Sequence, residues 1–335
     1  MILYDFDYER PASFEEASLR LRGLGAGARV AAGGTDLLPN MRIEIVRPDT
    51  LVSLSALSPE APVLLADGGV RIDALTRLAV LEKDELIREA VPMLAKAAGS
   101  VAGNQIRQMA TLGGNLCQDT RCMYVNQKHD YQFKAPCYKR GGDLCYPFPN
   151  NPHGTCWSVH MSDTASPLIA LGARLEVLGG SGTRQIGIEE LYTGSGITPI
   201  GLAHGDLLTA ILIPKAPARF GWGYCKSTRR GGMEFGIAVI AVTILLDDGL
   251  ETCRSARIVV GAVRERPVRL AKTEAAMVGS VIDKNAIAEI AAAATKELNP
   301  IPHHGFTKSY IRDDFTVKLR RTLDSAVQVA QQPRS

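Results

Sequence analysis

The stretch Thr111-Leu112-Gly113-Gly114-Asn115 contains two adjacent glycines and leads into an unusual concentration of cysteines. Five of the seven cysteines in the chain follow it closely: Cys117, Cys122, Cys137, Cys145 and Cys156. A glycine turn can bring backbone N–H groups close to a phosphate. Clustered thiols in a reducing compartment are typical of metal binding or redox chemistry. Together the two features predict a metal centre beside a nucleotide site, and therefore electron transfer.

A second glycine turn lies earlier in the chain, in Ala32-Gly33-Gly34-Thr35-Asp36. It follows Ala28–Ala32, which we predict to be a short buried strand. A strand, a glycine turn and a helix start together point N–H groups at an anion. Neither turn matches the dinucleotide or Walker patterns, and each alone is also typical of an ordinary strand–helix connection. As a pair, the two turns favour a clamp on a pyrophosphate.

The composition is that of an ordinary globular protein with more than one domain. The chain has 335 residues and a formal net charge of +3, which is too small to indicate nucleic acid or an anionic membrane as partner. No apolar run approaches the ~20 residues of a transmembrane helix. The N-terminal Met1–Asp7 is acidic where a signal peptide would be basic. We therefore expect a cytoplasmic protein.

Local signals predict several elements on either side of the cysteines. Ser13 and Glu16 form a candidate capping box for a helix that ends near Gly23. Asp67-Gly68-Gly69 predicts a hairpin turn, and Pro92 should interrupt a helix over residues 84–100. Beyond a Pro-rich linker at 214–218, predicted strands precede predicted helices, which indicates an α+β C-terminal domain. These strands are expected at 220–226, 238–245 and 255–263, and the helices at 283–298 and 306–330.

Three motifs resemble those of one family. Ala31–Met41, Thr111–Asn115 and Ser162-Asp163-Thr164-Ala165 are similar to the motifs of the FAD-binding medium subunits of molybdenum hydroxylases, the xanthine dehydrogenase and carbon monoxide dehydrogenase group. The resemblance covers essentially the whole chain. It implies an α+β protein with a vanillyl-alcohol-oxidase/PCMH-type FAD-binding domain of two subdomains over residues 1–216. A C-terminal α+β domain like that of the carbon monoxide dehydrogenase flavoprotein would follow over residues 217–335.

The resemblance also implies the residues around FAD. One side of the pyrophosphate would be lined by Ala32, Gly33, Gly34, Thr35, Asp36 and Leu37, and the other by Thr111, Gly113, Gly114 and Asn115. Asp163 would lie near the ribityl chain and the ring, Leu208 would pack by the isoalloxazine, and Lys226 would approach its polar edge. A cation at that edge would favour the anionic reduced flavin. Without the resemblance, Lys226 is also typical of a solvated strand residue.

The segment between the second and third motifs is much longer than is usual in the family. Residues 116–161 separate Asn115 from Ser162, with an irregular insertion at about 117–160. Within the family this resembles the 4-hydroxybenzoyl-CoA reductase type, which carries an extra [4Fe–4S] cluster on such a loop. Four soft thiolates suit iron–sulfur ligation, and we predict Cys122, Cys137, Cys145 and Cys156 as ligands. Cys117 is the fifth candidate, but it lies only two residues beyond Asn115.

The cysteine spacing leaves two other interpretations open. Fourteen, seven and ten residues separate the four cysteines, which matches neither a ferredoxin motif nor a zinc knuckle. A structural zinc site could use three cysteines with His129, His153 or His160. Five unliganded thiols on an exposed loop are a further possibility, although such thiols are prone to oxidation.

The resemblance implies a subunit of a larger enzyme. The partners would be a large molybdopterin subunit and a small subunit with two [2Fe–2S] clusters, assembled as a dimer of heterotrimers. Electrons would pass from reduced ferredoxin through [4Fe–4S] and FAD to [2Fe–2S] and molybdenum, for the reductive dehydroxylation of 4-hydroxybenzoyl-CoA. The alternatives are the FAD subunit of an oxidative hydroxylase acting on another aromatic or N-heterocycle, and a free-standing FAD oxidase.

Overall fold

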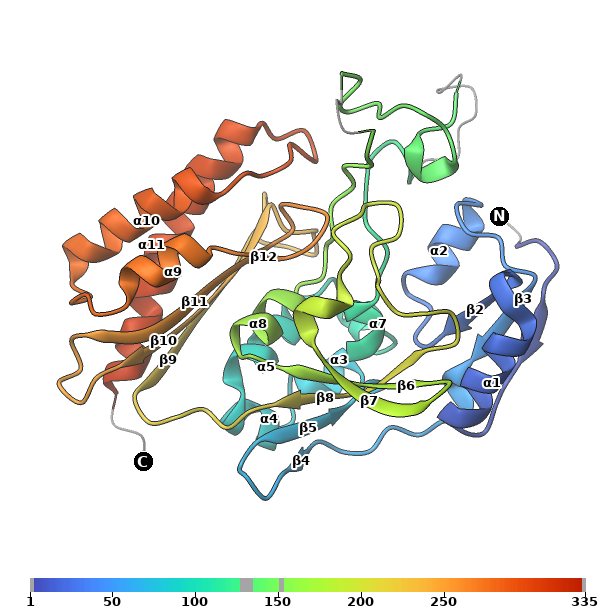
Figure 1. Ribbon diagram of the computed structural model, residues 1–335, viewed down its shortest axis with the longest axis horizontal. Coiled ribbons are helices and arrows are strands. Elements are labelled where there is room, and N and C mark those ends of the chain that lie inside the picture. The colour runs from blue at the N-terminus through green and yellow to red at the C-terminus, as the bar shows by residue number, and fades with distance from the viewer. Residues whose placement is uncertain (1–2, 127–134, 151–153, 333–335) are drawn as a thin grey trace.

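Three β-sheets, each with its own helices, follow one another along the chain (Figure 1). The computed structural model describes residues 3–126, 135–150 and 154–332. The first sheet has the strand order β1-β3-β2, the second β4-β5-β8-β6-β7 and the third β12-β11-β10-β9. No helix in these described ranges combines the length and the apolar character that crossing a bilayer demands.

The first sheet is parallel, because helices carry the chain back between its strands. Its elements are β1 (Asp7–Glu9), α1 (Phe14–Leu24), η1 (Gly25–Gly27), β2 (Ala28–Ala31), α2 (Leu37–Arg42), β3 (Thr50–Ser53) and η2 (Leu54–Ala56). Helix α1 begins at the predicted cap, where Ser13 Oγ accepts the backbone N–H of Glu16 at 3.1 Å. The carboxylate of Glu16 accepts the N–H of Ala12 at 2.8 Å, one residue before the cap, so the Ser13 half of the predicted capping box forms as expected and the Glu16 half is shifted by one residue.

The second sheet is antiparallel and takes strands from both sides of the cysteine segment. Its strands are β4 (Val63–Leu64), β5 (Val70–Asp73), β6 (Arg174–Gly179), β7 (Gly182–Gly187) and β8 (Leu207–Ile213). The helices beside it are α3 (Leu78–Leu81), α4 (Glu85–Ala90), α5 (Pro92–Gly99), α6 (Asn104–Arg107), α7 (Leu112–Leu116), α8 (Ala165–Ala170) and η4 (Ile188–Leu191). Pro92 separates α4 from α5, as predicted, and stands at the start of α5, where its missing N–H costs nothing.

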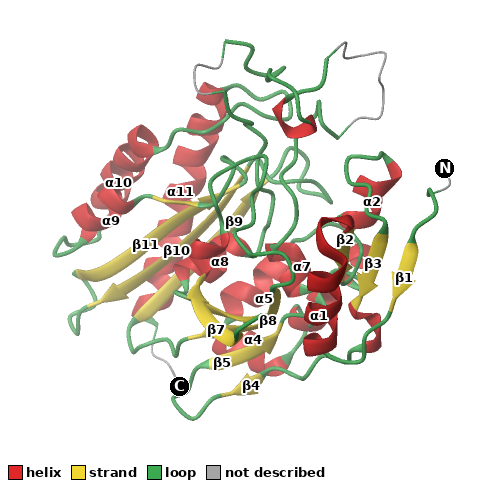
Figure 2. Cartoon of the chain, turned by 45° about the vertical axis from the view of Figure 1, so that its right-hand side comes forward, coloured by secondary structure: helices red, strands yellow, loops and turns green. Residues whose placement is uncertain are grey.

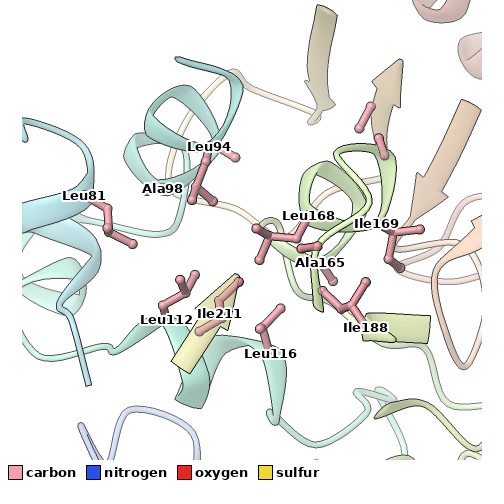
Figure 3. Close-up of a cluster of buried hydrophobic side chains, with 14 of the residues drawn as sticks. Leu81, Leu94, Ala98, Leu112, Leu116, Ala165, Leu168, Ile169, Ile188 and Ile211 are labelled. Atoms are coloured by element: carbon pink, nitrogen blue, oxygen red, sulfur yellow. The ribbon is translucent and has the colours of Figure 1, made fainter. Parts of the chain in front are cut away.

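Side chains from these helices and from β8 form one buried cluster (Figure 3). Leu112 and Leu116 of α7 contribute to it, and so do Ala165 and Leu168 of α8. The second glycine turn and the third sequence motif are therefore fixed to the same core. The hydrophobic core therefore holds both motifs in place without the help of a ligand.

The third sheet is buried on both of its faces. It contains β9 (Phe220–Ser227), β10 (Ala238–Leu246), β11 (Cys253–Gly261) and β12 (Val268–Arg269), and the helices are α9 (Ala271–Met277), α10 (Lys284–Glu297) and α11 (Lys308–Gln331). Val239 and Ala241 of β10 belong to the cluster with α5 and α8. Ile240 and Val242 belong to a separate cluster with α10 and α11. Because alternate side chains enter different cores, the strand is apolar almost throughout.

The cysteine segment rises from the body of the protein between α7 and α8 (Figures 1 and 2). Its base is closed by an antiparallel bridge in which Arg121 N donates to Val159 O at 2.7 Å and Val159 N to Arg121 O at 2.9 Å. Its only regular element in the described residues is η3 (Tyr138–Arg140). Further out, the rings of Tyr124 and Tyr146 stack with centroids 5.7 Å apart. The described part of the insertion is thus an anchored loop with its own small aromatic contact.

Helix α11 lies so close to β9 that a side chain at Gly223 has no room. A Cβ placed on Gly223 would lie 2.2 Å from the carbonyl oxygen of Thr322. We expect Gly223→Ala to lower the free energy of unfolding by about 2 kcal/mol, because the helix must move away from the sheet. Gly232→Ala is the matched control, since nothing lies within 4 Å of its added Cβ. Urea titration of both variants checks this, and equal midpoints would contradict it.

Candidate functional site

The two glycine turns lie against each other. A Cβ added to Gly33 would lie 2.0 Å from the carbonyl oxygen of Met109 and 3.1 Å from Cα of Ala110. The backbone of the first turn therefore touches the segment that enters the second turn, although they are distant in sequence. The structure thus brings together the two motifs that the sequence analysis paired.

The first turn offers unused backbone donors. In the part of the chain that the structure describes, the N–H groups of Gly33, Gly34, Thr35 and Asp36 donate to no protein acceptor. Gly34 adopts a φ of +70°, which turns the chain sharply into α2. The turn is half-buried, so consecutive free donors there are expected to have a ligand. Consecutive free N–H groups are the feature that anion-binding nests use.

The second turn is different, because its N–H groups are already engaged. Gly113 N donates to Ala74 O at 2.8 Å, Asn115 N to Thr111 O at 2.9 Å, and Gly114 N to Thr111 Oγ1 at 3.1 Å. The sequence predicted two equivalent sources of N–H groups. In the structure, only the first turn has them free, and the second offers a close backbone surface and the Thr111 hydroxyl.

Asn115 connects the second turn to the third motif. Its Oδ1 accepts hydrogen bonds from Ser162 Oγ and from Thr164 Oγ1, each at 2.7 Å. Asn115 and Ser162 are both buried, and Thr164 is fully buried. All three motifs that carry the family resemblance are therefore assembled at one place.

Asp163 and Lys226 form a buried ion pair beside this assembly. Lys226 Nζ donates to Asp163 Oδ2 at 2.7 Å and to the carbonyl oxygen of Ser100 at 2.9 Å, and both charged side chains are 6% exposed. Ser100 Oγ also shares a 2.8 Å hydrogen bond with the Tyr224 hydroxyl. Asp163 Oδ1 is buried and has no partner among the described residues. Lys226 is therefore not the solvated strand residue that its sequence context also allowed.

Burial dominates the titration of Asp163. It raises the pKa of this carboxyl to about 6, although the Lys226 charge and hydrogen bond act in the opposite direction. Leu208, the third residue expected near a flavin ring, lies in β8 and is 8% exposed. It belongs to the same buried cluster as Tyr224.

Neighbouring thiols contribute to the titration of two of the four predicted cysteine ligands. Burial raises the pKa of Cys122, and Cys156 and Cys137 raise it further. Burial likewise raises the pKa of Cys145, with further contributions from Cys156 and Cys122. Backbone N–H groups near these two sulfurs oppose the shifts: those of Val125 and Tyr124 at Cys122, and those of Trp157 and Phe148 at Cys145. Ionised sulfur at this place would thus have hydrogen-bond donors.

Cys117 is separated from these four. It packs against the main core, and burial raises the pKa of its thiol to about 12. The carbonyl oxygen of the neighbouring Leu116 faces His160 Nε2 at 3.3 Å. Its environment is therefore apolar core and not the projecting loop, which supports its omission from the ligand set.

The described residues do not hold a preformed single-ion site. Among them, no group of three His, Cys, Asp or Glu side chains converges closely enough for one metal ion. His160, a candidate zinc ligand, is buried against Tyr192 with ring centroids 4.8 Å apart, and burial lowers its pKa to about 4. His129 and His153 lie outside the described residues. A four-iron cluster is larger than one ion, so its thiolates need not meet at one point.

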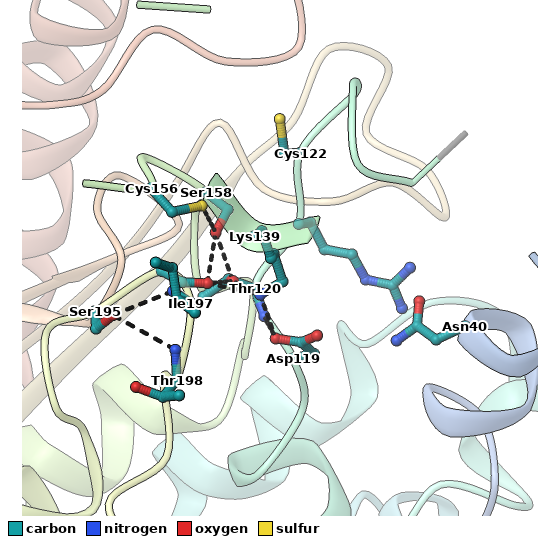
Figure 4. A network of polar contacts seen from close by, with 12 residues as sticks. Asn40, Asp119, Thr120, Cys122, Lys139, Cys156, Ser158, Ser195, Ile197 and Thr198 are labelled. Atoms are coloured by element: carbon teal, nitrogen blue, oxygen red, sulfur yellow. Dashed lines mark hydrogen bonds and ion pairs between the residues drawn. The ribbon is translucent and has the colours of Figure 1, made fainter. Parts of the chain in front are cut away.

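Polar residues that the sequence motifs do not include anchor the loop (Figure 4). Lys139 Nζ donates to Asp119 Oδ1, Thr120 Oγ1 and Gly196 O, each at 2.6 Å, and its side chain is 5% exposed. Arg121 forms an ion pair with Asp36 of the first turn. Nothing in the local sequence marks these residues, because their partners lie on distant segments.

Comparisons with known proteins agree with this assembly. Residues 4–216 match the family described as FAD binding domain in molybdopterin dehydrogenase, and residues 222–326 match the CO dehydrogenase flavoprotein C-terminal domain. The chain is 32% identical to the aldehyde oxidoreductase FAD-binding subunit PaoB of Escherichia coli, over 81% of this chain and 85% of that protein. It is 28% identical to the carbon monoxide dehydrogenase medium chain of Afipia carboxidovorans, over 97% and 98% of the two chains.

Solved structures show the same fold. The structure of reconstituted CO dehydrogenase from Oligotropha carboxidovorans superposes with a TM-score of 0.78 at 26% identity, covering 98% of this chain and 100% of that one. Quinoline 2-oxidoreductase from Pseudomonas putida 86 superposes with a TM-score of 0.77 at 23% identity, covering 99% of this chain and 100% of that one. This similarity supports the fold alone. The predicted fold class is confirmed.

The contact at Gly33 gives a test of the paired turns. We expect Gly33→Ala to lower the amount of FAD that copurifies by about tenfold or more, because the added methyl group separates the turns and disorders the free N–H groups. Gly23→Ala is the control, since its added Cβ meets nothing within 4 Å. Flavin absorbance relative to protein measures the outcome, and equal flavin content in both variants would contradict the expectation.

The raised pKa of Asp163 predicts a pH-dependent stability in the flavin-free chain. A carboxyl whose pKa is higher in the folded state stabilises the fold most when it is protonated, so this contribution is lost as pH rises from about 4 to about 6. Relative to Asp163→Asn, the free energy of unfolding should fall by roughly 2–3 kcal/mol over that interval, at about 1.36 kcal/mol per pKa unit. Urea titrations at each pH measure this, and parallel pH profiles for both chains would refute it.

Proposed function

Because this chain belongs to the family of FAD-binding subunits of molybdopterin dehydrogenases, we propose that it is the electron-transfer subunit of a molybdenum-containing enzyme. The specific proposal is a ferredoxin-linked enzyme of the 4-hydroxybenzoyl-CoA reductase type, in which this subunit binds FAD and one [4Fe–4S] cluster. The observation that supports the cluster assignment is that Cys122, Cys137, Cys145 and Cys156 belong to one projecting loop, whereas Cys117 packs against the main core.

The free donors of the first turn fit a dinucleotide pyrophosphate. A doubly charged pyrophosphate would satisfy the consecutive N–H groups of residues 33–36, which have no protein acceptor in the described part of the chain. The proposed contacts on this side are Ala32, Gly33, Gly34, Thr35, Asp36 and Leu37. The proposed contacts on the other side are Thr111, Gly113, Gly114 and Asn115. The Thr111 hydroxyl already accepts Gly114 N–H, so its own proton can point to the ligand.

Asp163, Lys226 and Leu208 are proposed to surround the flavin end. Lys226 is held by Asp163 and the Ser100 carbonyl, and its ammonium group can supply positive potential at a flavin edge. The unpartnered Asp163 Oδ1 can accept a hydrogen bond from a ribityl hydroxyl. Leu208 presents an apolar surface that excludes water. Bound FAD exchanges one or two electrons, whereas a [4Fe–4S] cluster exchanges one.

The loop cysteines fit a [4Fe–4S] cluster by donor chemistry. Cys122, Cys137, Cys145 and Cys156 would supply four thiolates, which iron–sulfur clusters require. Backbone N–H groups near Cys122 and Cys145 would favour the thiolate form of those sulfurs. The loop that carries the four cysteines projects from the body of the protein (Figure 1). That position suits exchange with an external one-electron carrier.

The subunit is proposed to work in a complex. The chain is also similar to the 6-hydroxypseudooxynicotine dehydrogenase complex subunit alpha and the nicotine 6-hydroxylase medium subunit, both from Paenarthrobacter nicotinovorans. By analogy, we infer a large molybdopterin subunit and a small subunit with two [2Fe–2S] clusters as partners, assembled as a dimer of heterotrimers in the cytoplasm. We divide the chain into an FAD-binding domain at 1–216 and a C-terminal domain at 217–335.

A second candidate function is the FAD subunit of an oxidative molybdenum hydroxylase. This function is favoured by the similarity of the chain to the caffeine dehydrogenase subunit beta and to the nicotine 6-hydroxylase medium subunit. The source of electrons separates the two functions in the assembled complex. Anaerobic reduction of the flavin by reduced ferredoxin, with no reduction by an oxidisable aromatic substrate, supports the reductase; the reverse pattern supports the hydroxylase.

The cluster assignment predicts a selective loss of iron. Anaerobically purified protein should contain iron and acid-labile sulfide in equal amounts, and Cys137→Ser should lose most of both while retaining FAD, because one of four ligands is removed. Cys225→Ser is the control, because Cys225 is a half-buried residue of β9 and not a predicted ligand. This variant should keep the iron of the unaltered chain. Stoichiometric zinc without iron in the unaltered chain would exclude the cluster.

A further inference from the structure

Asp36 joins the first glycine turn to the cysteine loop. Its Oδ1 pairs with Arg121 Nη2, and its Oδ2 accepts the backbone N–H of Asp119 at 2.9 Å. Both partners lie between Cys117 and Cys122, far from residue 36 in sequence. The side chains of Asp36 and Arg121 are 23% and 19% exposed, so solvent screens this pair only partly.

The contact continues into the segments that carry the other thiols (Figure 4). Asp119 Oδ1 accepts from Lys139 Nζ at 2.6 Å, two residues beyond Cys137. Lys139 also donates to Thr120, whose hydroxyl lies 2.6 Å from Ser158 Oγ. Ser158 Oγ in turn lies 3.2 Å from Cys156 Sγ. One polar network thus runs from Asp36 to two separate thiol-bearing segments.

A second connection reaches Cys122 from α2. Asn40 Oδ1 accepts from Asn126 Nδ2 at 3.4 Å, and Asn126 Oδ1 accepts the backbone N–H of Cys122 at 2.9 Å. Asn40 is buried in the helix that follows the first turn. The first turn and its helix therefore contact the loop at two points.

The charges of Asp36 and Arg121 explain how the loop can affect dinucleotide binding. Asp36 belongs to the turn with free N–H donors, so its carboxylate lies on the segment that would receive the phosphates of a dinucleotide. An unpaired carboxylate there would repel them, and the Arg121 guanidinium cancels that repulsion. The neutralising charge belongs to the cysteine loop. If the loop moves away, the first turn regains a negative charge.

We propose that Asp36 and Arg121 couple dinucleotide binding to the order of the described loop residues around Cys122, Cys137 and Cys156, so that each stabilises the other. Arg121 is a positioning residue in this scheme: it acts on the dinucleotide through Asp36. Binding of FAD fixes the turn, and the fixed carboxylate holds Arg121 and Asp119 in place. By reciprocity, an ordered loop tightens FAD binding by the same factor. The inference rests on the proposed FAD site and does not require the iron–sulfur cluster.

Thiol reactivity of the full chain tests the coupling. The protein is treated anaerobically with a chelator, stripped of FAD, and exposed to iodoacetamide with and without saturating FAD. Peptide mass spectrometry follows the alkylation of Cys122, Cys137 and Cys156, with core Cys253 as internal reference. FAD should slow alkylation of these three thiols about fivefold or more in the unaltered chain. In Arg121→Ala, FAD should slow the alkylation of these thiols by less than about twofold.

Two further variants distinguish charge coupling from a general structural effect. Arg121→Ala should weaken FAD binding about fivefold or more, measured by flavin fluorescence, because Asp36 is left unpaired. Asp36→Asn combined with Arg121→Ala should restore the affinity, since no carboxylate remains to repel the phosphates. Arg254→Ala is the control, because its ion pair with Asp248 is well exposed in the C-terminal domain. It should leave both measurements unchanged.

The outcomes separate this coupling from the proposed function. An unaltered chain that binds FAD without protecting the loop thiols would overturn the coupling alone. So would equal protection in Arg121→Ala, or an affinity that the double variant does not restore. A chain that binds no FAD would overturn the proposed function itself, and the coupling with it.

Discussion

The close approach of two backbone segments at Gly33 is the constraint on which the rest of the site depends. The position of the Met109 carbonyl leaves no space for a side chain there, so the first turn can lie directly on the chain entering the second. The same turn carries the free N–H groups of residues 33–36, and its Asp36 contacts Arg121 and Asp119 at the base of the loop. Glycine is required at this position by geometry and not by flexibility.

The site also depends on how the third sheet joins the second. Lys226 stands on β9, whereas Asp163 and Ser100 belong to the FAD-binding part of the chain, so their hydrogen bonds cross from one unit to the other. The apolar packing of β10 and β11 on α8 fixes the distance between them. A buried pair of opposite charges tolerates little displacement, because either charge alone would be costly to desolvate. The core thus sets the electrostatics of the proposed flavin end.

Much of the scaffold could be predicted from the sequence because its signals are local. The Ser13 cap, the turn at residues 67–69, the Pro92 break and the apolar strands of the C-terminal sheet all follow from a few neighbouring residues. Strand β7 was missed because its exposed, polar sequence Gly182–Gly187 has no apolar alternation. Lys139 and Arg121 could not be predicted, since a buried cation is recognised only by partners that folding brings near it. The sequence also could not show that the N–H groups of the second turn are already hydrogen-bonded, because their acceptors include Ala74, which folding brings near the turn.

Strand β10 has a consequence for the independence of the domains. Its alternate side chains belong to two different hydrophobic cores, one shared with α5 and α8 and the other with α10 and α11. Removing the C-terminal sheet would uncover the face of α8 that packs on β10 and β11, and would destroy the second core entirely. Melting should therefore be cooperative across both units, with a single heat-absorption peak. A fragment truncated at residue 216 would need a substitute apolar surface, supplied by a chaperone, a detergent or self-association.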